Sequence, residues 1–209
     1  MVSTGSVRAQ LQARGISPVR MWGRGVDLHN FTPDASPPTF FADLPRPIML
    51  YVGRVAVEKN IEAFLGVEHP GSKVVVGDGP ALAGLKSMFP QAYFAGSLSG
   101  RALAGAYAGA DVFVFPSKTD TFGLVMIEAL ACGTPVAAYP VSGPIDVIDE
   151  SVGALDDDLP TAIGRALTRD RDACRAYGKT FTWRRSTHQF LAALASTPTV
   201  ASTANLALA

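Results

Sequence analysis

The sequence predicts an α/β protein with a doubly wound parallel sheet, and three observations support this fold class. Short apolar segments at 48–52, 73–76, 112–115 and 136–138 alternate with segments suited to helices. Strands that are apolar along their length are typical of parallel sheets covered on both faces. Glycines close several of these segments, as expected where a strand turns into a loop. Ligands of such a domain bind at the carboxyl ends of its strands.

Strands and helices are expected in alternation from residue 48 onward. The strands are 48–52, 73–76, 92–94, 112–115 and 136–138, and the helices between them are 61–65, 81–88, 101–108 and 122–131. Two or three further helices are expected over 159–194. Trp183, Phe190, Leu191 and Leu194 have helical spacing there, and we predict that they lie in the core.

The two ends of the chain differ from this pattern. Residues 1–31 are expected to hold a helix at 6–13 and a strand at 19–22, which cannot bury their own apolar faces and look like the remnant of another domain. Five prolines mark residues 32–47 as an extended linker. The main domain is expected at 48–195, and residues 196–209 are expected to form a flexible tail.

Composition narrows the class of protein. Lys plus Arg and Asp plus Glu each number 18, so the formal net charge is zero and no nucleic-acid partner is expected. No apolar run approaches the roughly 20 residues that span a bilayer, so we expect a cytoplasmic protein, with peripheral contact at the inner face of a membrane left open. The two cysteines, Cys132 and Cys174, fit small buried residues.

No metal site is expected. The three histidines lie far apart in sequence, without the spacing of metal ligands. The run Asp156–Asp158 resembles a metal-binding DxD, but it precedes a predicted helix, where acidic residues cap the backbone and favour the helix dipole. We prefer the capping interpretation.

Glu128 stands out in the predicted helix 122–131. Its neighbours are apolar on every side, so the helix is expected to be buried. A buried carboxylate is costly unless it has a partner, which is a basic residue, a set of backbone donors or the hydroxyl groups of a ligand. An internal ion pair, or exposure on a narrow polar stripe, is the structural alternative.

The start of the same helix suits an anion. Asp120 or Thr121 is the expected N-cap, and the free backbone N–H groups of Phe122, Gly123 and Leu124 lie at the positive end of the helix dipole. A phosphate at this end and a diol at a carboxylate about two turns away would fit a nucleoside diphosphate lying along the helix.

Arg54 and Lys59 supply positive charge on the same edge of the sheet. They follow Gly53 at the end of the strand 48–52, so they lie on the expected ligand side. Arginine binds phosphate oxygens with a fixed fork of donors, and lysine adds a mobile point charge. A solvated loop is the alternative for this pair.

Six motifs follow one another along the chain. They are Arg24–Asp27, Gly53-Arg54 with Glu58–Asn60, Gly77–Pro80, Phe94–Leu98, Ala110–Ser117 and the block from Asp120 to Glu128. Together they resemble the retaining glycosyltransferases of the GT-B fold, in the large family 4, over residues 19–194. The resemblance implies that the domain is the Rossmann-like, nucleotide-sugar-binding half of a GT-B enzyme, with a UDP- or GDP-hexose as donor and no cofactor.

The resemblance also implies roles for individual residues. Arg54 and Lys59 would neutralise the diphosphate as the glycosidic bond breaks, and Glu128 would accept the ribose hydroxyls. Ser97 and Leu98 would meet the nucleobase, beside Gly53. Asp120, Thr121, Phe122, Gly123 and Leu124 would hold the donor sugar and its phosphate. The family has glutamate where Asp120 stands, so the carboxylate here is one methylene shorter.

A GT-B enzyme needs two such domains, with the acceptor in the cleft between them. The resemblance therefore implies that most of the acceptor domain is absent from this chain. We expect transfer to a lipid or glycan acceptor only with a separate acceptor-domain chain, and self-association through the exposed interdomain face without it. The segments 119–123 and 139–144 look most like bacterial members that glycosylate lipids or transfer mannose.

Two other hypotheses are kept. One is a non-catalytic nucleotide-sugar-binding module or an inactive fragment. The other is an unrelated Rossmann-like enzyme that uses NAD, which is disfavoured because no GxGxxG follows a strand.

Overall fold

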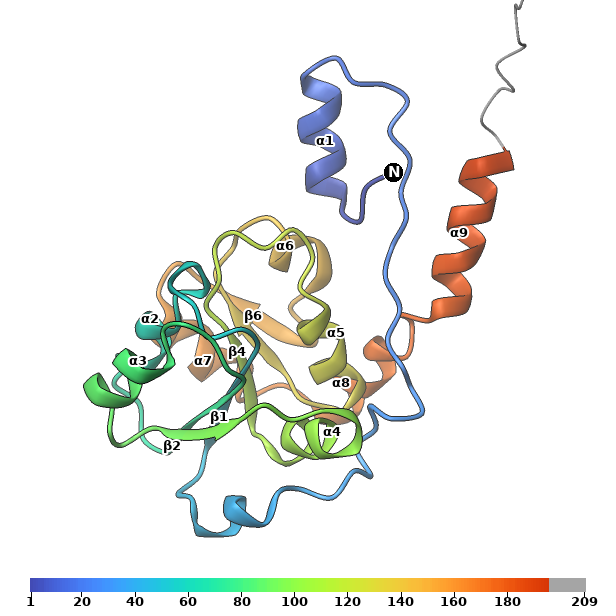
Figure 1. Ribbon diagram of the computed structural model, residues 1–209. Coiled ribbons are helices and arrows are strands. Elements are labelled where there is room, and N and C mark those ends of the chain that lie inside the picture. The colour runs from blue at the N-terminus through green and yellow to red at the C-terminus, as the bar shows by residue number, and fades with distance from the viewer. Residues whose placement is uncertain (196–209) are drawn as a thin grey trace, which may run out of the picture.

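The computed structural model describes residues 1–195, and its centre is a six-stranded parallel sheet (Figure 1). Its spatial order is β3-β2-β1-β4-β5-β6. The strands are β1 (Ile48–Val52), β2 (Ser72–Val76), β3 (Tyr93–Gly96), β4 (Val112–Phe115), β5 (Val136–Ala138) and β6 (Gly153–Leu155). The predicted doubly wound α/β fold is confirmed. The strand order reverses between β1 and β4, and ligands of open α/β sheets bind at such a switch point.

Alternate residues of each strand face two hydrophobic layers. Ile48, Leu50 and Val52 pack toward α4 (Gly100–Gly109), α5 (Leu124–Ala131) and α8 (Arg171–Gly178). Met49 and Tyr51 pack toward α2 (Ile61–Leu65), α3 (Leu82–Met88) and α7 (Leu159–Ala166) on the other face. Every residue of β1, β4 and β5 is buried. Burial on both faces explains why these strands lack polar alternation.

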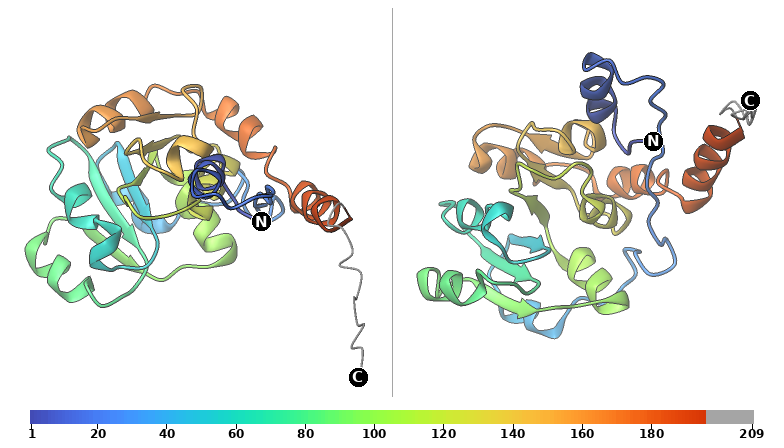
Figure 2. Two further views of the ribbon diagram at one scale, coloured as in Figure 1. Left: turned by 90° about the horizontal axis from the view of Figure 1, so that it is seen from above. Right: turned by 45° about the horizontal axis from the view of Figure 1, so that its top comes forward.

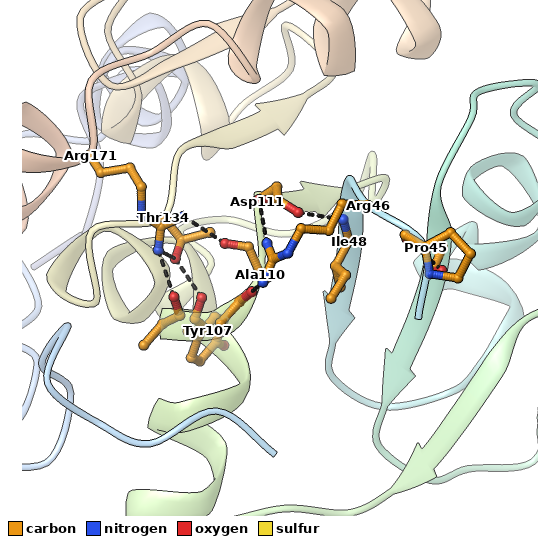
Figure 3. Close-up of polar contacts among 11 residues, drawn as sticks. Pro45, Arg46, Ile48, Tyr107, Ala110, Asp111, Thr134 and Arg171 are labelled. Atoms are coloured by element: carbon orange, nitrogen blue, oxygen red, sulfur yellow. Dashed lines mark hydrogen bonds and ion pairs between the residues drawn. The ribbon is translucent and has the colours of Figure 1, made fainter. Parts of the chain in front are cut away.

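A polar network joins the amino ends of β1 and β4 (Figure 3). The carboxylate of Asp111 accepts hydrogen bonds from the backbone N–H of Ile48 at 2.6 Å and from the guanidinium of Arg46 at 2.6 Å. The guanidinium of Arg171 donates to the carbonyl oxygens of Ala110 at 2.6 Å and Ala108 at 2.7 Å. These side chains satisfy backbone groups at the entry of β4 and the end of α4. They hold β1 and β4 together at the edge opposite the expected ligand site.

The sequence patterns did not predict three short elements, and they predicted too early a start for α5. The 3₁₀ turn η2 (Val57–Lys59), the helix α6 (Pro144–Val147) and the strand β6 were not expected. Each is only three or four residues long, too short to show a period. Helix α5 was expected to begin at Phe122 but begins at Leu124, because Gly123 adopts a left-handed conformation with φ of +78°.

The region 1–31 contains the expected helix but no regular strand. Helix α1 spans Gly5–Ala13, whereas the strand expected at 19–22 is reduced to an isolated bridge between Val2 and Met21. This segment has no sheet to join and runs instead beside α9 (Trp183–Ala195) (Figure 1). Because residues 19–22 have no partner strand, they form no ladder of backbone hydrogen bonds and no regular strand.

Placing the apolar residues of α9 in the core was wrong. The exposed fractions are 52% for Trp183, 55% for Leu191 and 50% for Leu194. Phe190 is half-buried and lies with its ring centroid 5.1 Å from that of Trp22. Figure 2 shows α9 projecting away from the sheet layers, so helical spacing identified an apolar face that the rest of residues 1–195 leaves exposed. The predicted tail, 196–209, lies outside the described residues.

The proline-rich segment 32–47, expected as an extended linker, packs against α4. It includes the 3₁₀ turn η1 (Thr39–Asp43), and its Phe41 is buried. A side chain at Gly105 would lie 2.0 Å from the carbonyl oxygen of Ser36, and one at Gly109 would lie 2.7 Å from Pro37. The small residues of α4 therefore let this segment lie against the helix. Within 1–195, no helix has the length and apolar character needed to cross a membrane.

Candidate functional site

A cavity of about 480 Å³ opens at the carboxyl ends of β1 and β4, where the strand order reverses. Its lining comes from the loop after β1, the loop after β4, the first turn of α5 and the N-terminal segment. The sequence-predicted residues in the lining are Gly53, Arg54, Lys59, Asp120, Thr121, Phe122, Gly123 and Leu124. Residues from two separate motifs therefore meet in one place. Ser3 and Arg24 also line it, and the sequence analysis assigned neither of them a role there.

A second, smaller cavity continues from the first. Its volume is about 250 Å³, and it shares Val52, Gly53 and Arg54 with the central one. Ser97 and Leu98, the residues expected to meet a nucleobase, line it. Ser97 and Leu98 are thus separated from Asp120 by the loop that carries Arg54.

Arg54 and Lys59 each have an acidic partner at the central cavity. The ammonium of Lys59 lies 2.7 Å and 2.9 Å from the two carboxylate oxygens of Asp120, and both side chains are about a quarter exposed. Arg54 pairs with Glu58, one helical turn away along the chain. These pairs hold the cations at the cavity wall with their charge already partly neutralised.

Asn60 fixes the loop that carries Lys59. Its backbone is left-handed, with φ of +54°, which asparagine tolerates better than most residues. Its amide donates to the carbonyl oxygen of Pro116 at 3.1 Å, and that residue follows β4. The loop after β1 is thus tied to the loop after β4, and Lys59 is positioned next to Asp120.

The first turn of α5 does not begin as predicted. Asp120 or Thr121 was expected to cap it, but the N-cap is Gly123. The carboxylate of Asp120 accepts its hydrogen bonds from Lys59 instead, and Thr121 is exposed. A side chain at Gly123 would come within 2.8 Å of the methyl group of Met126, so the backbone turns tightly here. The N–H of Met126 donates to the carbonyl oxygen of Gly123 at 3.0 Å, so the N–H groups of Leu124 and Val125 are the ones at this end of the helix that suit an anion.

Glu128 has a partner that the sequence analysis missed. The hydroxyl of Tyr107 donates a hydrogen bond to its carboxylate at 3.0 Å. Tyr107 is fully buried in α4, and its carbonyl oxygen accepts from Thr134 at 2.6 Å. Burial raises the pKa of the Glu128 carboxyl, and the Tyr107 hydrogen bond offsets part of that rise. Tyr107 had a signal in the sequence, since it is a single large polar-tipped residue among alanines and glycines in 102–110.

Glu128 does not line either of these cavities. It lies on α5 at the contact with α4 and is partly exposed. A partly exposed carboxylate held by a tyrosine resolves the burial problem that the sequence posed, without a basic partner.

The acidic run at 156–158 is a helix cap. The carboxylate of Asp158 accepts from the backbone N–H of Thr161 at 3.1 Å, at the start of α7, and Asp156 lies 3.4 Å from Arg165. The capping interpretation is confirmed. In residues 1–195, His, Cys, Asp and Glu side chains form no group of three that would hold a metal ion.

Sequence comparison identifies the family. The model of the family described as "Glycosyl transferases group 1" matches residues 46–169, which include β1 to α7 and every residue of the central cavity except Ser3 and Arg24. The chain belongs to this family. The GT-B resemblance of the motifs is thereby confirmed at the level of the family.

Individual relatives agree with the family assignment. The chain is 42% identical over 149 residues to a GDP-mannose-dependent alpha-mannosyltransferase of Mycolicibacterium smegmatis, an alignment covering 68% of this chain and 40% of that protein. It is 33% identical over 201 residues to a sulfoquinovosyl transferase of Arabidopsis thaliana, covering 84% of this chain and 39% of the relative. The chain thus spans about 40% of the length of these curated relatives.

Solved structures share the fold. Sucrose-phosphate synthase from Thermosynechococcus elongatus superposes with a TM-score of 0.77 at 29% identity, over 93% of this chain and 57% of that one. Anabaena HepE, solved in complex with UDP, superposes with a TM-score of 0.72 at 17% identity, over 94% of this chain and 63% of that one. The second likeness concerns the fold alone.

The Tyr107–Glu128 hydrogen bond leads to a pH-dependent stability prediction. Because burial raises the pKa of Glu128 above its ordinary 4.5, the folded state favours the protonated carboxyl. The stabilisation that the folded state gains from a protonated Glu128 is fully present below pH 4.5. It is lost as the pH rises through the raised pKa of Glu128. Tyr107→Phe removes a donor to the charged form, so it should raise that pKa further. Relative to the unmodified protein, Tyr107→Phe should lower the free energy of unfolding by roughly 1.5–3 kcal/mol near pH 8. The difference should become smaller toward pH 5.

Urea unfolding at the two pH values measures this difference. Tyr51→Phe is the matched control, because Tyr51 is also buried but donates to the neutral carbonyl oxygen of Arg54 at 2.9 Å. Its cost should be the same at both pH values. An equally pH-independent cost for Tyr107→Phe would contradict the assigned hydrogen bond to a charged Glu128.

Proposed function

We propose that this chain binds a nucleoside-diphosphate hexose, with UDP or GDP as the nucleotide, and supports retaining transfer of the hexosyl group to a lipid or glycan acceptor. The observation that carries the proposal is the central cavity at the β1/β4 switch point. There Arg54, Lys59 and the open first turn of α5 surround a space of about 480 Å³. A diphosphate is the group that this combination of donors suits best.

The connected cavities give the donor a direction. The base would lie at Ser97 and Leu98 in the smaller cavity, and the diphosphate would lie at Arg54, which lines both. The hexose would then lie near Asp120 and the first turn of α5. Glu128 would accept the ribose hydroxyls from the flank of α5, held in place by Tyr107. The roles of these residues are part of the proposal.

The chemistry follows from charge. As the glycosidic bond breaks, negative charge grows on the departing diphosphate. Arg54 and Lys59 would stabilise that charge in the transition state, and the N–H groups at the start of α5 would add fixed dipoles. The proposed donor supplies its own leaving group, so no cofactor is needed. That absence stays a prediction, as does the cytoplasmic location.

The ion pair between Lys59 and Asp120 would exchange partners when a donor binds. The Asp120 carboxylate holds the ammonium of Lys59. A diphosphate that attracts Lys59 would release the Asp120 carboxylate, which would then be free to accept hydrogen bonds from sugar hydroxyls. Phosphate binding and sugar recognition would thus be coupled through one ion pair.

The second candidate function is a non-catalytic nucleotide-sugar-binding module. It is favoured by the family match, because the matched residues 46–169 hold the groups to which donor roles are proposed above. A separate acceptor-domain chain, or self-association through the exposed face of α9, would cover the apolar residues Leu191 and Leu194. We predict transfer from UDP- or GDP-hexose only when an acceptor-domain chain is present, measured as labelled sugar in the product. Absence of transfer with every such partner would support the binding module.

Nucleotide binding tests the donor site without an acceptor. We expect UDP or GDP to bind in calorimetry, and the variant with both Arg54→Ala and Lys59→Ala to weaken the diphosphate at least about a hundredfold, since two charge-assisted contacts are lost. Binding of the free nucleoside should change little. Glu128→Gln should weaken the binding of the nucleoside and of the nucleotide by similar factors. Lys179→Ala, which removes an exposed cation beyond the cavity, is the control. Equal losses in the control and the double variant would contradict the site.

Asp120→Asn tests the exchange of partners. Asparagine cannot hold Lys59 as an ion pair, so the free lysine should bind UDP or GDP about threefold more tightly, within the range of a partly exposed ion pair. The same variant should lose most of the added affinity that the hexose gives to the nucleotide sugar. Calorimetric titration with the nucleotide and with the nucleotide sugar measures both. A weaker affinity for the nucleotide alone would contradict the exchange.

A further inference from the structure

The motif Arg24–Asp27 contains one residue that the fold itself does not use. Gly25 allows the backbone to approach α9, because a side chain there would lie 2.4 Å from the backbone nitrogen of Trp183. Val26 is buried, and its N–H donates to the carbonyl oxygen of Phe181 at 3.0 Å. The carboxylate of Asp27 accepts from the amide of Asn30 at 2.6 Å and closes a turn. Arg24 has no such structural task and lines the central cavity.

The guanidinium of Arg24 is held in place without an acidic partner. It stacks on the ring of Trp22, 4.6 Å from the ring centroid, and one of its nitrogens lies 3.4 Å from the carbonyl oxygen of Trp22. The indole N–H of Trp22 donates to Ser186 at 3.0 Å, so α9 fixes the stacking platform. Among residues 1–195 no carboxylate pairs with Arg24, whereas Arg54 and Lys59 both have one. A stacked guanidinium keeps the edge of its fork free for an anion.

Arg24 lies where the central cavity meets a third one. The third cavity measures about 370 Å³ and shares Ser3, Arg24 and Phe122 with the central cavity. The smaller cavity with Ser97 and Leu98 joins the central one through other residues, those around Gly53. The smaller cavity and the third cavity thus adjoin the central one through different lining residues, and Arg24 belongs to the set shared with the third cavity, not to the set shared with the cavity of Ser97 and Leu98.

The third cavity carries a second cation. Arg185 lines it, and no acidic side chain in the described part of the chain pairs with the Arg185 guanidinium. The one carboxylate in its lining, Asp146, already accepts from the backbone N–H of Ser6 at 2.9 Å and from the Ser6 hydroxyl. The space thus presents two guanidinium groups and one carboxylate, which is hydrogen-bonded to Ser6 and to the backbone N–H of Gly143.

We propose that the third cavity is the acceptor subsite and that it binds a phosphate or carboxylate group of the acceptor through Arg24, with Arg185 as a second contact. The inference rests on the proposed function, because the donor must occupy the other two cavities. A hexose at Asp120 would then lie between the diphosphate and Arg24, on the path to the acceptor. An anion at Arg24 would bring the acceptor next to the sugar, and such positioning is a large part of catalysis.

The test uses the full chain with its nucleotide bound and sn-glycerol 3-phosphate as the probe. UDP or GDP is titrated first, so a failure of the proposed function is seen separately as absence of nucleotide binding. The nucleotide-saturated protein is then titrated with glycerol 3-phosphate and with glycerol. We expect binding of glycerol 3-phosphate but not of glycerol. Arg24→Gln should weaken that binding about tenfold, the loss of one charge-assisted contact, and leave nucleotide affinity within about twofold.

Matched variants separate a built site from general positive charge. Arg185→Gln should weaken the binding of glycerol 3-phosphate about threefold. Arg184 is the exposed neighbour of Arg185 and does not line the cavity, so Arg184→Gln should leave this binding unchanged. Arg24→Lys keeps the charge but loses the stacked fork, so it should fall between wild type and Arg24→Gln. Equal effects of Arg184→Gln and Arg185→Gln would overturn the proposal. So would a loss of nucleotide affinity in Arg24→Gln as large as that in Arg54→Ala.

A vesicle arm distinguishes the sources of the anion. Phosphatidylcholine vesicles with and without phosphatidylglycerol are added to the same nucleotide-bound protein. Binding that needs phosphatidylglycerol and is lost in Arg24→Gln assigns the subsite to a lipid phosphate. Binding of glycerol 3-phosphate without vesicle binding assigns it to a small anionic acceptor. Absence of both overturns the subsite.

Discussion

The pairing of β1 with β4 is the constraint on which the rest of the molecule depends. Asp111 secures it at the amino ends by accepting from the backbone of Ile48 at 2.6 Å, and the two strands then continue in parallel. Their carboxyl ends consequently emerge side by side, and the two loops that follow them diverge to opposite faces of the sheet. The central cavity is the space left by that divergence. Without this pairing, Lys59 and Asp120, which are 61 positions apart in the chain, would not meet.

The electrostatics of the cavity depend on two ion pairs within the protein. Lys59 is paired with Asp120 and Arg54 with Glu58, so a diphosphate has to compete with carboxylates for both cations. Competition of this kind reduces the gain from binding any single anion. It favours a ligand that replaces two pairs at once and gives the released carboxylates new partners, and a nucleotide sugar carries both a diphosphate and hydroxyl groups.

The N-terminal segment and α9 pack against each other beside the sheet. Trp22 joins them through its hydrogen bond to Ser186 and its ring contact with Phe190. Arg24 is the point at which this assembly reaches the cavity. Among the described residues, Leu191 and Leu194 leave the apolar face of α9 exposed. The donor side thus depends on the sheet, and Arg24 depends on contacts between the two ends of the chain.

The sequence by itself determined the layered α/β fold, most of its strands and helices, and the family, because burial on both faces of a parallel sheet leaves continuous apolar segments with glycine turns between them. It also placed Arg54, Lys59 and Asp120 at the ligand edge. Tertiary structure alone decided that Lys59 pairs with Asp120, that Tyr107 holds Glu128, that Gly123 starts α5, and that α9 stays outside the core. Each of these depends on which distant segments meet in space, and a local period in the chain carries no information about that.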